Sequence, residues 1–320
     1  MIILKRKGYL YQNIYKFENI EQAYNEVCKN TKNKRKVAQL QEYKCIYISR
    51  IQNILKNRTY TPGTYNVFTI YEPKERRIVS QNIQDKIVNH LVSRYILYPA
   101  VLPCLLDVNV ASRKGLGTKE GVKLANKFHR ICNIKYKKYY ILKCDISKFF
   151  ASIDHHILKQ KLKKRIKDAH ALKIIYDIID IEKSGLSIGA MTSQVLAIFY
   201  LNDLDHFIKE ELKIKYFVRY QDDFLLFHPS KTYLQYCLKE IKNFLEKEKL
   251  NLNKKTRIYS NSNKFIFLGR KPNGNYAKYR SVNRKIKKRM YLYKAGKINL
   301  INLTTSIICY KNLCKKGSNC

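Results

Sequence analysis

The stretch RYQDDFLLF, residues 219–227, places two adjacent aspartates between apolar segments. Tyr216-Phe217-Val218 precedes the acids and Phe224-Leu225-Leu226-Phe227 follows them, which predicts a β-hairpin with a Gln-Asp-Asp tip. Two neighbouring carboxylates repel each other, so basic side chains or a divalent cation should neutralise them. The alternative is a solvated turn, because aspartate is common in turns.

A second apolar segment upstream also ends at an acid. The run Tyr139-Tyr140-Ile141-Leu142 predicts a strand that leads to Asp145, although an aspartate there could instead cap the next helix. Three carboxylates at the ends of adjacent strands form the arrangement that holds two Mg²⁺ ions for phosphoryl transfer. Mg²⁺ binds through a few carboxylates together with substrate phosphates, so three acids suffice.

The charge balance indicates a polyanionic partner. The 320-residue chain has 64 Lys+Arg against 24 Asp+Glu, a formal net charge of +40 that is spread along its length. Nucleic acid is the leading partner and a membrane surface is the second. A hydrophobic content of 45% excludes wholesale disorder.

No segment approaches the roughly 18 apolar residues that a membrane helix requires, and the apolar run at the start is too short for a signal peptide. These features predict a cytoplasmic protein. The nine cysteines include no C-x-x-C pair and are interpreted as reduced thiols. A metal site at Cys309, Cys314 and Cys320 is the alternative, but their spacing does not favour it.

Residue patterns divide the chain into alternating helical and strand segments. Apolar residues at helical spacing predict helices over 20–57, 83–98, 157–180, 192–212 and 231–249. Strands are predicted over 67–71, 78–79 and 256–268, in addition to those that carry the acids. A basic glycine-containing loop at 111–118 leads into a further helix, another helix should begin near Ser152 or Asp154, and a basic, mostly helical tail follows residue 270.

In this order the segments resemble a reverse transcriptase over nearly the whole chain. YQDD matches the Tyr-x-Asp-Asp box, and CDISKFFASIDH matches the first catalytic-aspartate motif of group II-intron-like bacterial enzymes. EPKERRIVSQNIQDKIV matches their fingers motif, and GLSIGAMTSQVLAIFYLNDLDHF matches the loop and helix beneath the incoming nucleotide. LNLNKKTRI and FLG match the two motifs that follow the box.

Within that family, the chain is most similar to the reverse transcriptases of diversity-generating retroelements. IGAMTSQ matches their Ile-Gly-x-x-Thr-Ser-Gln signature, where group II intron enzymes and retrons tend to have Gln-Gly and then Ser-Pro. YEPKERRIVS, ASRKGLGT and the tail segment YLYKAGKINLINLTTSI also resemble that subfamily. Ser187 departs from it, because proline usually occupies this position.

The resemblance implies an α+β right-hand polymerase fold with a ferredoxin-like antiparallel palm sheet and mostly helical fingers and thumb. The fingers would comprise 1–110 and 155–188. The palm would comprise 111–154 and 189–268. A basic helical thumb would comprise 269–320.

For catalysis, the resemblance implies that Asp145 and Asp222 bridge two Mg²⁺ ions, for which Mn²⁺ can substitute. The Ile146 carbonyl is a further metal ligand, and Asp223 is the second acid of the box, assisting at the metals. Lys255 matches the lysine proposed as general acid toward the leaving pyrophosphate. In so basic a chain, Lys255 could equally be a surface charge.

For the nucleotide, the resemblance implies that Lys74 and Arg76 hold the triphosphate, with Arg77 able to exchange roles with them. Phe150 falls at the steric gate against the ribose 2′-OH, while core packing is the alternative for either Phe149 or Phe150. Gly189 supplies a close backbone approach.

Ile188 stands where selective enzymes carry glutamine, and an aliphatic side chain cannot donate that hydrogen bond. In the subfamily this residue accompanies error-prone copying, especially opposite template adenines. The alternative is that Ile188 only packs under its loop.

The expected partners are template RNA, the cDNA or primer strand, dNTPs and an accessory variability determinant protein, with no membrane. The residues expected to bind template and primer are Arg113, Lys114, Tyr220, Gln221, Arg284, Lys287 and Lys288. The resulting hypothesis is mutagenic copying of a template-repeat RNA into cDNA. The alternatives are a phage-defence or abortive-infection reverse transcriptase, and a non-catalytic RNA-binding protein with a relict polymerase fold.

Overall fold

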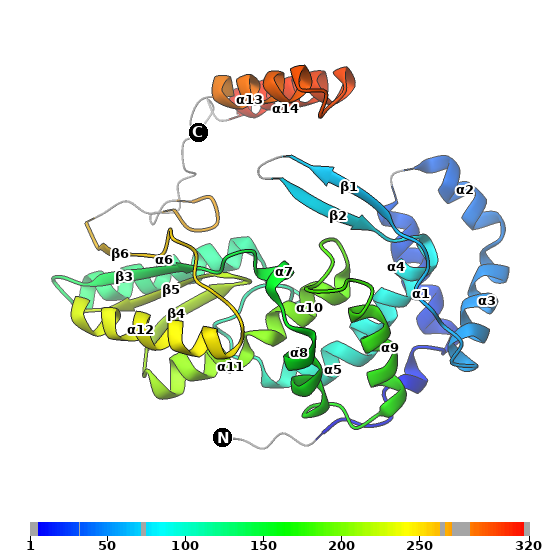
Figure 1. Ribbon diagram of the computed structural model, residues 1–320, viewed down its shortest axis with the longest axis horizontal. Coiled ribbons are helices and arrows are strands. Elements are labelled where there is room, and N and C mark those ends of the chain that lie inside the picture. The colour runs from blue at the N-terminus through cyan, green and yellow to red at the C-terminus, as the bar shows by residue number, and fades with distance from the viewer. Residues whose placement is uncertain (1–5, 32, 72–74, 263–265, 271–281, 317–320) are drawn as a thin grey trace.

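The computed structural model describes residues 6–31, 33–71, 75–262, 266–270 and 282–316 (Figure 1). At its centre is a four-stranded antiparallel sheet in the order β4-β5-β3-β6. The strands are β3 (Tyr140–Asp145), β4 (Tyr216–Tyr220), β5 (Asp223–His228) and β6 (Arg257–Ser260). The hairpin around the two aspartates and the strand ending at Asp145 are therefore confirmed, and they are neighbours in one sheet.

Both faces of this sheet are covered by helices, which explains why its strands are nearly continuous apolar runs. α6 (Thr118–Lys135) packs against β4 and β5, and α12 (Lys231–Lys247) packs against β3, β5 and β6 (Figure 1). Side chains alternate between the faces: Leu142 and Leu226 join the main core with α12, while Leu225 joins a second core with α6.

Helices and one hairpin form the rest of the N-terminal half. α1 (Phe17–Asn30), α2 (Lys34–Glu42) and α3 (Lys44–Lys56) precede a two-stranded antiparallel hairpin, β1 (Asn66–Ile70) and β2 (Arg76–Ser80). α4 (Ile83–Val92), a π-helical turn over Ser93–Leu97 and α5 (Tyr98–Val101) follow. The Asn82 side chain starts α4 by accepting the Asp85 N–H.

Three predicted segments are more divided than the sequence pattern suggested. The helix expected over 157–180 is two helices, α8 (His155–Lys163) and α9 (Ala169–Ile179), because the Asp168 carboxylate caps a new start. The helix expected over 192–212 is α10 (Met191–Tyr200), α11 (Asn202–His206) and a π-helical turn over Phe207–Glu211. Of the strand expected over 256–268, β6 is the regular part, and Phe267 adds an isolated bridge to Arg270.

α7 (Phe149–Ser152) follows β3. The Asp154 side chain caps α8, which confirms Asp154 as one of the two helix starts that the sequence predicted. α13 (Val282–Lys294) and α14 (Leu300–Lys316) pack together on the side of the β1–β2 hairpin (Figure 1). Lys297 lies 5.5 Å from the centre of the Tyr71 ring. Among the described helices, none has both the length and the apolar character needed to cross a bilayer.

Candidate active site

The three aspartates meet at one end of the central sheet. Gln221 and Asp222 form the turn between β4 and β5, which we call the aspartate turn, and Gln221 has a left-handed backbone with φ of +53°. Asp223, the first residue of β5, lies opposite Asp145, the last residue of β3. The Ile146 N–H donates to the Asp222 carbonyl oxygen at 3.2 Å, which ties the turn to the chain leaving β3.

The carboxylates influence one another electrostatically. Burial raises the pKa of Asp223 to about 6, the nearby Lys143 ammonium opposes this, and the Asp145 and Asp222 carboxylates raise the pKa further. Lys143 Nζ donates to Asp223 Oδ2 at 3.1 Å and to the Ile266 carbonyl oxygen at 2.9 Å. A basic side chain therefore neutralises one of the three acids.

The donors present fit a divalent cation. Asp223 Oδ1 is buried and has no hydrogen-bond partner among the described residues. Asp145 and Asp222 are close enough to disfavour its ionisation, so an added positive charge would relieve the repulsion. The described residues contain no ready-made cluster of three His, Cys, Asp or Glu side chains. A cation held here would therefore need waters or substrate oxygens to complete its shell.

A buried ion pair that sequence reasoning missed lies behind the aspartate turn. Arg219 and Asp205 are both 0% exposed, and Arg219 donates Nε to Asp205 Oδ1 at 2.6 Å and Nη2 to Oδ2 at 2.5 Å. The guanidinium also donates to the carbonyl oxygens of Ile198 (3.2 Å) and Gln221 (3.0 Å). Arg219 therefore joins α10, α11 and the aspartate turn. An arginine inside an apolar strand is a signal that could have identified it.

The loop before α10 is fixed to both α7 and β2. Gly185 has φ of +72°, and a Cβ there would lie 2.6 Å from the Phe150 carbonyl oxygen and 2.6 Å from Ala151 Cα. Leu186 N–H donates to that Phe150 oxygen at 2.7 Å. At the other end, Val79 N–H donates to the Ile188 carbonyl oxygen at 3.4 Å. Only a residue without a side chain fits this contact at Gly185.

The predicted nucleotide-binding residues surround this loop. Phe149 is 3% exposed and Phe150 is half-buried, so Phe150 is the one of the pair with an accessible ring. Ile188 is half-buried and Gly189 is exposed, with φ of +119°.

On β2, Arg77 binds both carboxylate oxygens of Glu182 at 2.9 Å, whereas Arg76 is exposed and makes no ion pair among the described residues. This arrangement favours Arg76 over Arg77 as the cation available to a ligand. Lys74 lies outside the described residues.

A polar cavity of about 290 Å³ opens beside Gly189. It is lined by Gln81, Lys86, His90 and Gln194, among others. Gln81 is 8% exposed, and its Nε2 has no hydrogen-bond partner among the described residues. A buried donor of this kind favours an acceptor supplied by a ligand.

Lys255 is exposed on a loop that adjoins the acids. Its backbone N–H donates to Asn253 Oδ1 at 3.1 Å, and the Asn253 N–H donates to the Asp145 carbonyl oxygen at 2.7 Å. Ile146, whose carbonyl is the expected metal ligand, forms a bridge with Leu252 in the same loop. The loop thus brings Lys255 to the end of β3, and its role as an acid stays a prediction.

The residues expected to contact template and primer fall into two groups. Near the turn, Arg113 pairs with Asp107 at 3.3 Å, the Gln221 amide donates to Ser112 Oγ at 2.8 Å, and Tyr220 is half-buried. In the second group, Lys114 is exposed on the loop before α6, and Lys287 and Lys288 are exposed on α13. Arg284 also belongs to α13, but its side chain lies outside the described ones.

Comparison with known proteins identifies a related family. A family model described as reverse transcriptase (RNA-dependent DNA polymerase) matches residues 54–271. No curated protein sequence matches the chain. A structure of telomerase from Candida albicans in complex with a TWJ fragment of telomeric RNA has a TM-score of 0.52 and 14% identity, over 80% of this chain and 55% of that one.

Two structures of telomerase from Candida tropicalis are similar at lower scores. The apo form, truncated from the C-terminal domain, has a TM-score of 0.49 and 16% identity, over 68% of this chain and 56% of that one. The complex with the TWJ fragment has a TM-score of 0.48 and 13% identity, over 87% and 56%. The chain therefore spans just over half the length of these telomerase chains. Together with the family match, the Candida albicans structure confirms the α+β right-hand polymerase fold.

Proposed function

The chain belongs to the reverse transcriptase family, and from that premise we propose that it synthesises DNA on an RNA template. The observation that carries the proposal is the meeting of Asp145, Asp222 and Asp223 at the ends of β3 and β5. Asp145 and Asp222 raise the pKa of the buried Asp223, so a bound cation would relieve the repulsion among these acids. Phosphoryl transfer brings such cations together with substrate phosphates.

In this proposal, Asp145, Asp222 and the Ile146 carbonyl hold two divalent cations. When bound, such ions would supply Lewis-acid stabilisation to the phosphoryl transfer. Arg219 donates to the Gln221 carbonyl oxygen at 3.0 Å and would in this way fix the position of the aspartate turn. Burial raises the pKa of Asp223 to about 6, and Lys143 opposes this shift by donating to Asp223 Oδ2 at 3.1 Å, which favours the ionised form that could assist at the metals.

Residues around the loop before α10 would select and orient the nucleotide. Arg76, together with Lys74, binds the triphosphate, a task that suits a guanidinium fork. The Phe150 ring excludes a ribose 2′-OH, and Lys255 donates a proton to the leaving pyrophosphate. Lys287 and Lys288 on α13 contact strand phosphates without reading sequence, as does Lys114 on the loop before α6. Arg113, Tyr220, Gln221 and Arg284 complete the proposed contacts with template and primer.

More specifically, we infer error-prone copying of a template-repeat RNA into mutagenised cDNA of a diversity-generating retroelement, with an accessory variability determinant protein. The support is Ile188, whose carbonyl is tied to β2 at 3.4 Å while its side chain offers no hydrogen-bond donor. A site that lacks this donor discriminates less between correct and incorrect pairs.

Single-nucleotide primer extension on RNA templates with Mg²⁺ tests both levels of the proposal. Every dNTP is offered opposite every template base to the wild type, Asp222→Ala and Ile188→Gln. Glu246→Ala, which removes an exposed carboxylate from α12, is the matched control. We expect extension to be lost in Asp222→Ala alone. We expect misincorporation to concentrate opposite adenine in the wild type and to fall in Ile188→Gln.

Each other outcome changes a defined part of the proposal. Faithful wild-type extension would keep the polymerase, remove the mutagenic role and favour a phage-defence enzyme. Extension by Asp222→Ala would contradict the assignment of the site. A wild-type protein that stays silent with its native RNA and accessory protein would favour a non-catalytic RNA-binding protein.

A further inference from the structure

A second cavity lies away from the central sheet. It has a volume of about 450 Å³ and opens where the segment before α1 meets the end of α3 and the start of α9. We call it the N-terminal cavity, and the lining residues on which the argument depends are Tyr9, Tyr11, Lys56, Arg58, Lys167 and Asp168. None of its lining residues belongs to β3, β4, β5 or β6, so it is separate from the candidate active site.

The walls of this cavity are joined by hydrogen bonds between segments far apart in sequence. The Lys167 N–H donates to the Lys7 carbonyl oxygen at 2.7 Å, and the Tyr11 N–H donates to Asp168 Oδ2 at 2.9 Å. The buried Tyr11 hydroxyl donates to the Leu55 carbonyl oxygen at 2.8 Å. The three segments are thus fixed to one another, and a ligand would meet a preformed site.

The charge of the cavity favours an anionic ligand. Lys56, Arg58 and Lys167 are exposed and make no ion pair among the described residues. The acid that lines the cavity is Asp168, and both of its oxygens already accept backbone N–H groups. Backbone N–H bonds lower the pKa of Asp168 despite its partial burial, so this charge is stabilised from within the protein. Three cations remain for a ligand.

The same cavity presents an aromatic ring to solvent. Tyr9 is 85% exposed and has φ of +55°, and Arg58, which lines the same cavity, has φ of +60°. At Arg58 this left-handed backbone terminates α3, since the Arg58 N–H donates to the Leu55 carbonyl oxygen at 3.1 Å and the Thr59 N–H to that of Ile54 at 3.0 Å. The Tyr11 and His170 rings, which also line the cavity, lie with centroids 5.8 Å apart. An exposed ring flanked by cations suits an unpaired base and its phosphates.

We propose that the N-terminal cavity binds an unpaired nucleotide of a single-stranded RNA segment, at a site separate from polymerisation. The base would stack on Tyr9, and Lys56, Arg58 and Lys167 would contact the flanking phosphates. A paired base offers no free face for stacking, which is why the unpaired form is favoured. The proposal does not require catalysis, since it concerns binding alone.

The absence of tryptophan from the chain gives a direct test. Tyr9→Trp introduces a single fluorophore in the cavity, and Tyr43→Trp introduces one at a 50% exposed position between α2 and α3 as the control. Each variant is titrated with single-stranded oligoadenylate of about 12 nucleotides, within the usual site sizes of strand-binding proteins. We expect saturable quenching at position 9 and little change at position 43.

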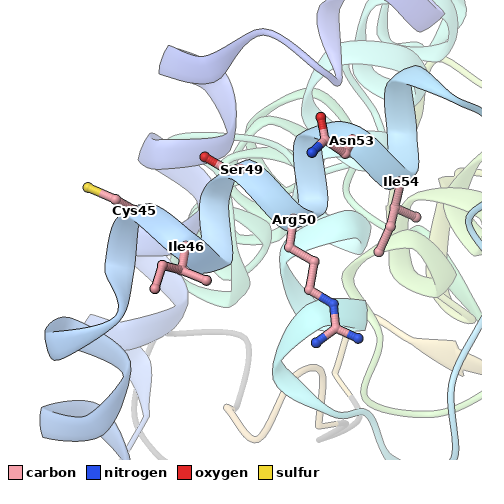
Figure 2. A pocket seen from close by; sticks show the side chains of 6 residues that line it. All are labelled: Cys45, Ile46, Ser49, Arg50, Asn53 and Ile54. Carbon is pink, nitrogen blue, oxygen red and sulfur yellow. The ribbon is translucent and has the colours of Figure 1, made fainter.

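Charge variants in the Tyr9→Trp background separate this cavity from the general basicity of the chain. Arg58→Gln should weaken the binding reported at position 9 several-fold and reduce its logarithmic salt slope by about 0.7. Arg50→Gln removes the same charge from α3, where Arg50 lines a different pocket with Ile46 and Ile54 (Figure 2), and should leave the curve unchanged. Loss of primer extension with retained quenching would leave this proposal standing and affect only the proposed catalysis.

Three outcomes would overturn the proposal. The first is equal quenching at positions 9 and 43, which would show non-specific binding to a basic surface. The second is equal quenching of position 9 by an RNA duplex, which would show that no unpaired base is bound. The third is quenching by free adenosine monophosphate as strong as by the strand, which would assign the cavity to a free nucleotide.

Discussion

Asp205→Asn should destabilise the fold by leaving the Arg219 charge buried beside a neutral partner. Both side chains are 0% exposed, and both carboxylate oxygens accept from the guanidinium. Arginine does not lose its proton in proteins, so the charge cannot be removed by titration. Breaking a buried pair in this way costs about 3–5 kcal/mol in the free energy of unfolding. Asp203→Asn is the matched control on α11, because Asp203 pairs with Lys161 from a side chain that is 54% exposed. Its cost should be smaller, because the buried Lys161 keeps a second carboxylate partner in Glu248 at 2.9 Å.

A double variant separates stability from positioning. Replacing Asp205 by leucine and Arg219 by methionine together removes both charges, and apolar replacements of a buried pair are often neutral or stabilising. The free energy of unfolding should therefore recover relative to Asp205→Asn. Primer extension should not recover, because the Gln221 carbonyl still lacks the donor that held it at 3.0 Å.

Urea unfolding followed by circular dichroism measures the first quantity, and single-turnover extension measures the second. A loss of less than about 1 kcal/mol in Asp205→Asn would refute the buried-charge argument. Wild-type extension by the double variant would show that Arg219 does not position the aspartate turn.

Three further predictions concern the residues Asp223, Gly185 and Phe150. Because the pKa of Asp223 is raised from 3.8 to about 6, its protonation stabilises the fold at low pH, and this contribution is lost as the pH rises through about 6. The test compares the free energy of unfolding of Asp223→Asn with that of the wild type, without divalent ions. The value for the variant minus that for the wild type should rise by up to about 3 kcal/mol between pH 4 and pH 7. A difference that does not change with pH would contradict this prediction. Gly185→Ala places a Cβ 2.6 Å from backbone atoms, whereas Gly115→Ala, with φ of +79°, meets nothing within 4 Å. The urea midpoints should show Gly185→Ala to be the more destabilising by about 1–3 kcal/mol, and equal losses would refute the steric argument. Phe150→Ala should increase ribonucleotide incorporation relative to deoxyribonucleotide incorporation in extension assays, and an unchanged ratio would reject Phe150 as the gate.

The parts of the fold that sequence predicts are those with a local pattern. The hairpin around Asp222 and Asp223 was predictable because apolar strand residues flank both sides of a polar tip. The strand ending at Asp145 was predictable for the same reason. The division of the helix over 157–180 had a local signal as well, since Asp168 precedes an apolar helical run and can cap it.

The contacts that sequence did not predict join residues from different elements. Arg219 and Asp205 are 14 positions apart, and neither position has a periodicity that marks a partner. The N-terminal cavity depends on Tyr11 and Asp168, which are 157 positions apart and are joined by one hydrogen bond. Such pairings depend on how the elements pack against one another, and one sequence by itself does not indicate which distant residues will be in contact.

Lys143 neutralises the negative charge of the paired aspartates only in part. It lies 3.1 Å from Asp223 Oδ2 and neutralises that acid from within β3, one strand away. One ammonium cannot compensate three carboxylates, and burial still holds the pKa of Asp223 at about 6. The site therefore keeps negative charge at the ends of β3 and β5, in a chain that is strongly basic elsewhere. A structural turn would gain nothing from this arrangement. In the proposed function, this negative charge would attract divalent cations.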